Sequence, residues 1–401
     1  MTPHVAEPLA PYDAVLLLSY GGPEGPDDVL PFMRNATAGR GVPDDRLREV
    51  SGHYGRWDGV SPINARNAEL LAALRTELAA RGSPLPVVIG NRNWHPFVSE
   101  ALRDLADGGA RRILAITTAA YASYSGCRQY REDVAGALEL LAAGDDGATG
   151  GGREADAAAR VGGAGGAPVR LVVDKTRPFY NTPGMLAANT DAIVAAFHQL
   201  VAEGVSADGI RLVLVTHSIP ASMERLSAPT AEERADLDGS EPGMAADLST
   251  EISYVAQHER LADVLLDAVA ARLGRRPQAD LVYCSRSGPP QARWLEPDVN
   301  DHLEAIAAGH LTDGRAVDVP TGVVVAPFGF VADHMEVVFD LDTEARETAS
   351  RLGLAYVRAA TAGTHPAFVA SLADVLAERA AVARGEDVHP DSTTGTGPFH
   401  T

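Results

Sequence analysis

The stretch Ala14-Val-Leu-Leu-Leu-Ser-Tyr-Gly-Gly-Pro-Glu24 decides the fold of this chain. Its apolar part, Ala14–Leu18, is short and free of polar residues, which is typical of a parallel strand covered on both faces of a sheet. Such a run is far too short to span a bilayer. The two glycines and the proline that follow end the strand, so we expect Tyr20 to project from a loop at the edge of the sheet.

Similar runs rich in Val, Ile and Leu recur along the chain, and segments with helical spacing separate most of them. One such segment is Ile63–Ala80, in which four leucines between Leu70 and Leu78 form a single stripe. Alternation of strands and helices predicts a doubly wound α/β fold. The expected strands are Ala14–Leu18, Pro86–Gly90, Arg112–Ile116, Val169–Val173, Leu212–Val215, Leu281–Tyr283, Gly322–Ala326 and Leu354–Val357.

The length of the chain predicts two domains. Its 401 residues exceed the roughly 250–300 residues that one core usually supports. We expect residues 1–176 and 177–401 to form two α/β halves of four parallel strands each. The Gly- and Ala-rich segment Gly144–Ala167 lacks an apolar stripe, which predicts a flexible surface insertion in the first half. The tail after about Gly385 is expected to be disordered.

Charge and cysteine content exclude several classes of protein. Acidic residues outnumber basic ones by 54 to 34, which argues against binding to a nucleic acid backbone. The two cysteines, Cys127 and Cys284, are too few for a disulfide scaffold or a four-thiolate metal site within one chain. The N-terminus lacks the basic region and the cleavage site of a signal peptide. These features predict a cytoplasmic protein that does not insert into a membrane.

Candidate catalytic residues follow the expected strands, where ligands bind in an open parallel sheet. His217 stands at the end of an apolar strand, and an ordinary imidazole can accept a proton near neutral pH. Glu336, Asp340 and Glu344 recur every four residues and should share one face of a helix. A lone histidine is often structural, and an acidic row is often only a solvated face. The alternative interpretation is a proton acceptor beside a path for divalent cations or protons.

Candidate ligand contacts follow the other strands. Ser61-Pro62 is expected to be the N-cap and first residue of the first long helix, whose free N–H groups could bind an anion. Asn91–Phe97 combines hydrogen-bond donors with a tryptophan, which suits a flat, acidic, conjugated ligand. Gly21-Gly22 lacks the spacing of a dinucleotide-binding loop, so a dinucleotide enzyme is disfavoured.

Together these segments resemble the ferrochelatase family from about Tyr12 to Arg384. The motifs that carry the resemblance are, in chain order, LLLSYGGPE, DGVSPIN, SYSGCRQY, THSIP and ADHMEVVFDLD. The resemblance implies a class II chelatase-like fold, in which two Rossmann-like domains face each other across a porphyrin cleft. It also implies insertion of Fe²⁺, as a substrate, into a porphyrin during heme biosynthesis.

The resemblance also implies roles for individual residues. His217 matches the catalytic histidine and Glu336 its partner carboxylate, and both would contact the metal. Asp340 and Glu344 match an acidic line behind that carboxylate, which in the family goes with a π-like helix and a second cation site. Which of His217 and Glu336 is the base stays open at this point.

The expected porphyrin is coproporphyrin III of the Gram-positive and actinobacterial type of enzyme. Tyr20 matches the axial tyrosine of that type, and the polar stretch Met33–Arg40 replaces the longer apolar lip of membrane-associated relatives. Tyr54, Ser61 and Tyr130 match porphyrin-contacting positions.

With two cysteines in the chain, we expect no [2Fe–2S] cluster. We also expect no organic cofactor. Transient contact with other heme-pathway enzymes is a further expectation. The alternatives are a protoporphyrin IX ferrochelatase, a cobalt or sirohydrochlorin chelatase, and a non-catalytic tetrapyrrole carrier.

Overall fold

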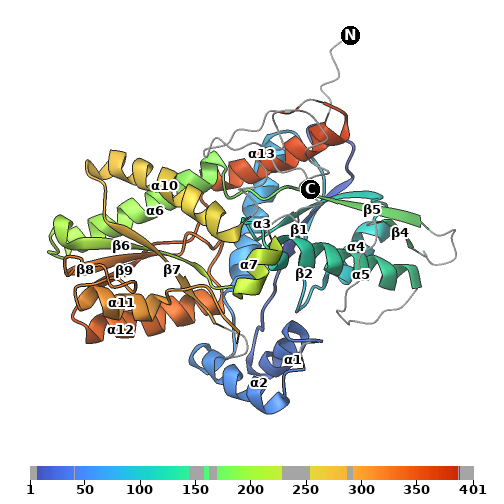
Figure 1. Ribbon diagram of the computed structural model, residues 1–401. Helices are drawn as coiled ribbons and strands as arrows, with labels where there is room; N and C mark the ends of the chain where they lie inside the picture. Colours follow the sequence, from blue (N-terminus) through green and yellow to red (C-terminus); the bar gives the residue numbers. More distant parts are fainter. Residues whose placement is uncertain are drawn as a thin grey trace, which may run out of the picture.

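The chain forms two α/β halves that lie side by side (Figure 1). The computed structural model describes residues 7–39, 41–143, 158–161, 169–227, 253–286, 292–386 and 388. The expected tail after residue 385 falls almost entirely outside these residues. The strands are β1 (Ala14–Ser19), β2 (Val87–Asn91), β3 (Arg112–Thr117), β4 (Ala158–Val161), β5 (Val169–Lys175), β6 (Ile210–His217), β7 (Ala279–Cys284), β8 (Gly322–Ala326) and β9 (Ala355–Arg358).

The two sheets repeat one topology. Their strand orders are β2-β1-β3-β5-β4 and β7-β6-β8-β9, and all pairings except that of β4 are parallel. The α/β fold and all eight expected strands are thus confirmed. The first sheet contains the four expected parallel strands, and β4 adds a fifth, antiparallel strand at its edge beside β5. The segment Gly144–Ala167 was predicted to be a flexible surface insertion, but its residues Ala158–Val161 form this edge strand. The other residues of the segment lie outside the described ones.

Helices cover both faces of each sheet. In Figure 1, α4 and α5 lie along the first sheet, while α6 and α10 lie on one side of the second sheet and α11 and α12 on the other. The helices are α1 (Pro26–Ala36), α2 (Asp44–Ser51), α3 (Ile63–Ala80), α4 (Val98–Asp107), α5 (Gln129–Ala143), α6 (Pro183–Ala202), α7 (Ala221–Ser227), α10 (Tyr254–Leu273), α11 (Val299–Ala307), α12 (Arg346–Arg351) and α13 (Pro366–Ala383). The 3₁₀ helices are η1 (Gly52–Trp57) and η3 (Ala207–Gly209), and the π-helices are η2 (Tyr124–Arg128) and η4 (Val337–Ala345).

Strand β1 shows why its residues are uniformly apolar. All six of its residues are buried, because alternate side chains enter two different cores. Val15 and Leu17 pack with the leucine stripe of α3, whereas Leu16 and Leu18 pack with α4 and α5. A strand covered on both faces has no position at which a polar side chain would meet water, so its sequence reads as a continuous apolar run.

The largest core runs through both halves. It joins Leu17 of β1 to Leu214 of β6 and Val324 of β8, and α13 contributes Phe368 and Leu372 to it. Helix α13, near the C-terminus, packs against both α3 and α6. All strands of the first sheet precede residue 176 in the sequence and all strands of the second sheet follow it. The largest apolar core nevertheless contains residues from both halves. The domain boundary at residue 176 stays a prediction.

Helix α6 belongs to this core. Among the described residues it is the one helix whose length and apolar composition would suffice to cross a membrane, and half of it is buried inside the protein. Its buried residues include Ile193, Phe197 and Leu200, which pack in the same apolar cluster as β6. Its composition is therefore accounted for by its place between the sheet and helices α10 and α13.

A buried ion cluster in the second sheet predicts sensitivity to acid. Burial alone would raise the pKa of Asp280, but hydrogen bonds from His302 and Arg211 lower it to about 2. A carboxylate whose pKa falls on folding stabilises the protein above its unfolded pKa of about 4, and this contribution is lost as the pH falls toward 2. We expect Asp280 to contribute about 2 kcal/mol to the free energy of unfolding at neutral pH.

Urea unfolding at pH 7, 4 and 2.5 measures this contribution. Between pH 4 and 2.5 the free energy of unfolding of the parent protein should fall by about 1 kcal/mol more than that of Asp280→Asn, because the contribution is only partly lost at pH 2.5. Equal losses in the two proteins would contradict the assignment.

Candidate active site

His217 and Glu336, 119 positions apart in the sequence, meet in the structure. His217 is the last residue of β6, and its Nε2 lies 3.3 Å from Oε2 of Glu336. Its Nδ1 donates a hydrogen bond to the carbonyl oxygen of Ser218. The His217 and Glu336 side chains are 30% and 43% exposed, so a ligand can reach both. The structure thus brings together the two residues that the sequence singled out.

The two side chains stabilise opposite charges on each other. Burial alone would lower the pKa of His217, but the charge of Glu336 and the hydrogen bond between them raise it to about 9. Burial alone would raise the pKa of Glu336, and the same interaction lowers it to about 2. At neutral pH the metal-free pair is therefore an imidazolium and a carboxylate.

A second histidine, which the sequence analysis did not single out, adjoins this pair. The Nδ1 of His334 lies 3.8 Å from the same oxygen of Glu336. Burial lowers the pKa of His334, partly offset by Glu336, so this imidazole stays neutral. The sequence could have indicated His334, because it lies two residues before Glu336 in the same segment after β8. Among the described residues, no three His, Cys, Asp or Glu side chains enclose one metal position.

The acidic row lies on a π-helix. The π-helix η4 begins directly after Glu336 and carries Asp340 and Glu344, where the residue pattern alone suggested an ordinary helix. A π-helix is rare and is often found at functional sites. Burial raises the pKa of Asp340 to about 7, with Glu336 and Glu344 adding to the rise and a hydrogen bond from Ser285 opposing it. Asp340 can therefore gain or lose a proton near neutral pH.

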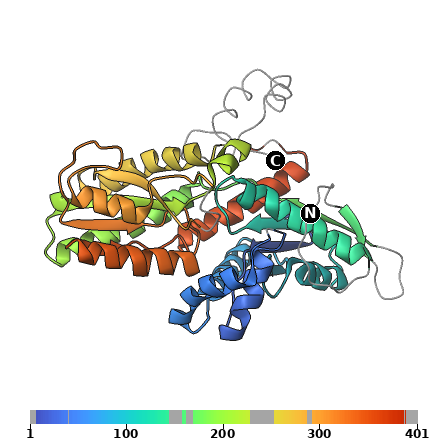
Figure 2. The same ribbon diagram turned by 60° about the horizontal axis from the view of Figure 1, so that its bottom comes forward.

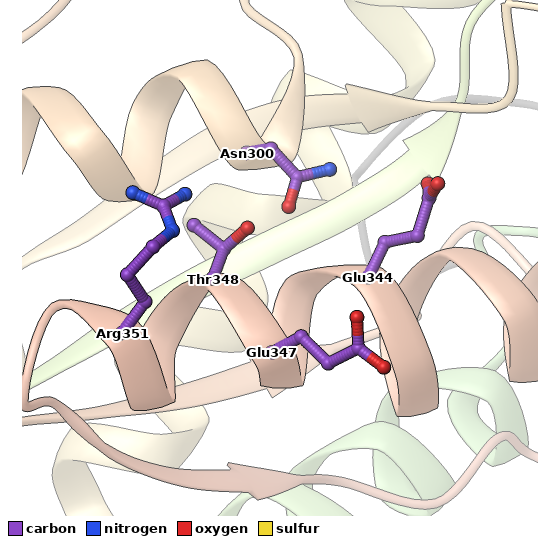
Figure 3. Close-up of a pocket in the computed structure, with 5 residues that line it drawn as sticks. All are labelled: Asn300, Glu344, Glu347, Thr348 and Arg351. Atoms are coloured by element: carbon purple, nitrogen blue, oxygen red, sulfur yellow. The ribbon is translucent and has the colours of Figure 1, made fainter.

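The outer end of the row opens into a cavity. Glu344 lines a hollow of about 440 Å³ together with Asn300, Glu347, Thr348 and Arg351. In Figure 3, Glu344, Glu347, Thr348 and Arg351 follow one another along a single helical run that faces Asn300 on the neighbouring helix. The acidic row thus leads from His217 to an open, largely polar hollow.

Arg358 holds this segment in place. It stands at the end of β9, and its NH2 group lies 3.1 Å from Oδ2 of Asp333 while its Nε lies 2.7 Å from Oδ1 of Asp342. Asp333 precedes His334, and Asp342 lies within η4. One guanidinium therefore binds the segment on both sides of Glu336. The sequence analysis missed Arg358, because nothing in the local pattern pairs it with two distant aspartates.

Tyr20 lies in the first half beside an arginine. Its side chain is exposed (40%), its ring contacts Phe32 edge to face at 6.1 Å between centroids, and the guanidinium of Arg92 lies 5.7 Å from its ring centre. Arg92 is itself fixed by an ion pair of 2.5 Å with Asp133. Tyr20 thus offers an accessible phenol next to a buried positive charge.

The remaining expected porphyrin contacts are less exposed. Tyr54 is half-buried, and its ring meets that of Phe32 edge to face at 6.3 Å. Burial raises the pKa of Tyr54, and the nearby carboxylate of Glu336 adds to the rise. Tyr130 is almost fully buried, and the guanidinium of Arg92 lies 5.0 Å from its ring centre. Ser61 is buried as well. These two side chains offer a ligand little surface.

The predicted cap at Ser61 was wrong. Helix α3 begins at Ile63, its N-cap position is Pro62, and no side chain caps it. The backbone N–H of Ser61 instead bonds to the carbonyl oxygen of Pro23, and a Cβ atom on Gly22 would lie 2.7 Å from that of Ser61. Ser61 therefore ties the loop after β1 to the start of α3, and the helix begins two residues later.

The first half contacts the acidic segment directly. The rings of Trp57 in η1 and Phe339 in η4 meet edge to face at 6.2 Å, and Arg56 forms an ion pair of 3.3 Å with Glu347. Helices α1 and α2, blue in Figure 2, lie near the junction of the two halves. The loop that carries Tyr54 thus lies against the segment that carries Glu336 and Asp340.

Comparison with known proteins shows the family to which this chain belongs. The sirohydrochlorin chelatase SirB of Bacillus subtilis subspecies spizizenii, solved with cobalt, aligns over 93% of this chain and 97% of its own with 10% identity and a TM-score of 0.43. That likeness is too distant to bear on function. The coproporphyrin III ferrochelatase of Streptomyces griseus is 46% identical over 98% of this chain and 92% of its own length. That of Streptomyces coelicolor is 44% identical over the same shares. The ferrochelatase family model matches residues 12–146 and 153–380. This chain therefore belongs to the ferrochelatase family.

Proposed function

We propose that the protein inserts ferrous iron into coproporphyrin III and so forms iron coproporphyrin in heme biosynthesis. The observation that carries the proposal is the partly exposed pair of His217 and Glu336, whose Nε2 and Oε2 atoms are 3.3 Å apart, together with the acidic row of η4. The curated relatives from two Streptomyces species, both named coproporphyrin III ferrochelatase, support the choice of porphyrin.

The reaction needs a proton acceptor and a metal contact at the same place. Two pyrrole N–H protons leave the macrocycle while Fe²⁺ loses its water and takes their position. A planar macrocycle presents its nitrogens poorly to a metal, so binding energy must hold it bent. Within this proposal Glu336 contacts the incoming iron, with His334 beside it. The charge of Fe²⁺ at Glu336 weakens the interaction that keeps His217 protonated, so His217 loses its proton to solvent or to the acidic row and can then accept a pyrrole proton. Asp340 and Glu344 then pass protons outward or hold a hydrated cation.

The porphyrin would lie between the two halves of the protein. Tyr20, exposed at the end of β1, contacts the face of the macrocycle opposite to His217, and Tyr54 lies at its edge. Coproporphyrin III carries four propionates and dissolves in water, so the enzyme needs no membrane docking and acts in the cytoplasm. Other enzymes of the pathway would supply the porphyrin and take the product during transient contacts.

The reaction as proposed requires no resident cofactor. The whole sequence contains two cysteines, whereas a [2Fe–2S] cluster usually takes four thiolates. The described structure has both of them, Cys127 and Cys284, as free thiols. Iron enters the account as a substrate.

Anaerobic metalation of two porphyrins tests the proposal. The protein is mixed with Fe²⁺ and either coproporphyrin III or protoporphyrin IX, and the loss of free-porphyrin absorption and fluorescence is followed against a protein-free control. We expect rapid loss with coproporphyrin III and a rate lower by at least about 10-fold with protoporphyrin IX, since the latter lacks two of the four propionates. A preference for protoporphyrin IX would overturn the choice of substrate. Binding of porphyrin without any metalation would indicate a carrier and overturn the proposed activity.

A further inference from the structure

A cluster of buried polar side chains lies directly behind His217. It consists of Thr216 on β6 and Tyr254 and His258 on α10, which we call the buried hub. The Oγ1 atom of Thr216 lies 2.8 Å from both the Tyr254 hydroxyl and Nε2 of His258. The Tyr254 hydroxyl also donates to the carbonyl oxygen of His217 over 3.1 Å. Thr216 and His258 are fully buried and Tyr254 is 6% exposed, so no ligand can reach the hub.

The hydrogens of the hub can be placed from its acceptors. Nδ1 of His258 lies 2.7 Å from the carbonyl oxygen of Tyr254, which can only accept, so Nδ1 carries the hydrogen. Burial lowers the pKa of His258 to about 3, which leaves Nε2 without a hydrogen, and the Thr216 hydroxyl donates to it. The Tyr254 hydroxyl is then the remaining donor, shared between Thr216 and the His217 carbonyl as a three-centre bond.

A second arm of the hub reaches the segment that carries Glu336. The ring of Tyr121 stacks on His258 with 3.6 Å between centroids and 10° between planes. Its hydroxyl donates to the carbonyl oxygen of Phe328 over 3.1 Å. The next residue, Gly329, passes so close to the hub that a Cβ atom there would lie 2.1 Å from Oγ1 of Thr216. From this point the chain runs on to Glu336.

The hub therefore contacts both the segment that carries His217 and the segment that carries Glu336. The proposed reaction requires a fixed distance between these two residues. We propose that Thr216, Tyr254 and His258 are positioning residues, which set the distance between His217 and Glu336 through the Tyr254 bond to the His217 carbonyl and the packing of Thr216 against Gly329. This inference rests on the proposed function, since it concerns the geometry of that reaction. Reactive groups tolerate displacements of only about 0.5 Å. Buried polar networks hold such geometry firmly, because an unsatisfied buried group is costly.

Removal of single hydroxyls tests the positioning role. Tyr254→Phe keeps the ring and removes the donor to His217. We expect kcat for iron insertion to fall about 10-fold, in the range found for supporting partners of metal-site residues, while KM for coproporphyrin III stays within about 2-fold. Thr216→Val should give a similar loss, and Thr216→Ser, which keeps the hydroxyl, should restore most of the rate.

Tyr283→Phe is the matched control. Tyr283 is also a buried tyrosine and lies opposite Thr216 on the neighbouring strand β7, so its replacement disturbs the same part of the core. Among the described residues no hydrogen bond joins its hydroxyl to the hub, so kcat of Tyr283→Phe should equal that of the parent. The inference is overturned if Tyr254→Phe and Thr216→Val both keep kcat within 2-fold of the parent, or if Tyr283→Phe loses as much. Should Tyr254→Phe fail to fold, the comparison of Thr216→Val with Thr216→Ser decides alone. A parent protein without any turnover would instead overturn the proposed function, and this inference with it.

Discussion

Replacement of His217 by alanine is expected to lower kcat for iron insertion by about 10³-fold, within the range for loss of a general base. Porphyrin affinity should change little, because Tyr20 and the loop that carries Tyr54 are untouched. Anaerobic single-turnover metalation gives the rate, and quenching of protein fluorescence by added coproporphyrin III gives the affinity.

His198→Ala is the control for this variant. His198 is an exposed histidine on α6, outside the candidate site, so its loss should leave both quantities unchanged. Near-normal turnover of His217→Ala would remove His217 from the mechanism. A comparable drop in kcat and in porphyrin affinity would assign His217 to binding instead.

The second large effect is expected for Glu336→Gln. The amide keeps the shape of the side chain but offers no charge to a cation, so kcat/KM for Fe²⁺ should fall by about 100-fold. The variant should also release the proton of His217 more easily. In the parent, Glu336 raises the pKa of His217 to about 9, so the imidazolium persists up to that pH. Without the carboxylate this pKa should fall, and the neutral form should appear at lower pH.

Histidine NMR signals of the metal-free protein, followed from pH 5 to 10, report this change directly. Glu203→Gln, at the C-terminal end of α6, removes one carboxylate remote from the candidate site and should leave the titration and the iron kinetics unchanged. An unaltered titration of His217 in Glu336→Gln would contradict the ion pair as the cause of its raised pKa.

Much of the fold could be predicted because buried positions are apolar and recur with the period of the strand or helix that carries them. A strand such as β1, covered on both faces, must be apolar at every position, and the stripe of α3 must recur with the helical period. The edge strand β4 has no such apolar pattern. Its four residues, Ala-Ala-Arg-Val, lie in a Gly-rich segment and pair with β5 through the backbone. Backbone pairing at a sheet edge places few demands on side chains.

The candidate site could be predicted only in part. His217 and Glu336 were recognisable because they follow strands and belong to family motifs. Arg358 and His258 were not, since their significance depends on contacts between distant segments, with Asp333 in one case and Thr216 in the other. The π-helix η4 was implied by the family resemblance and is confirmed, but residue spacing alone did not indicate it.

A crystal structure of the protein with bound iron coproporphyrin III tests the central claim most directly. The account predicts a macrocycle between the two halves, with Tyr20 on one face and His217 and Glu336 on the other, both within reach of the metal. A macrocycle seated elsewhere, with its iron remote from His217 and Glu336, would contradict it.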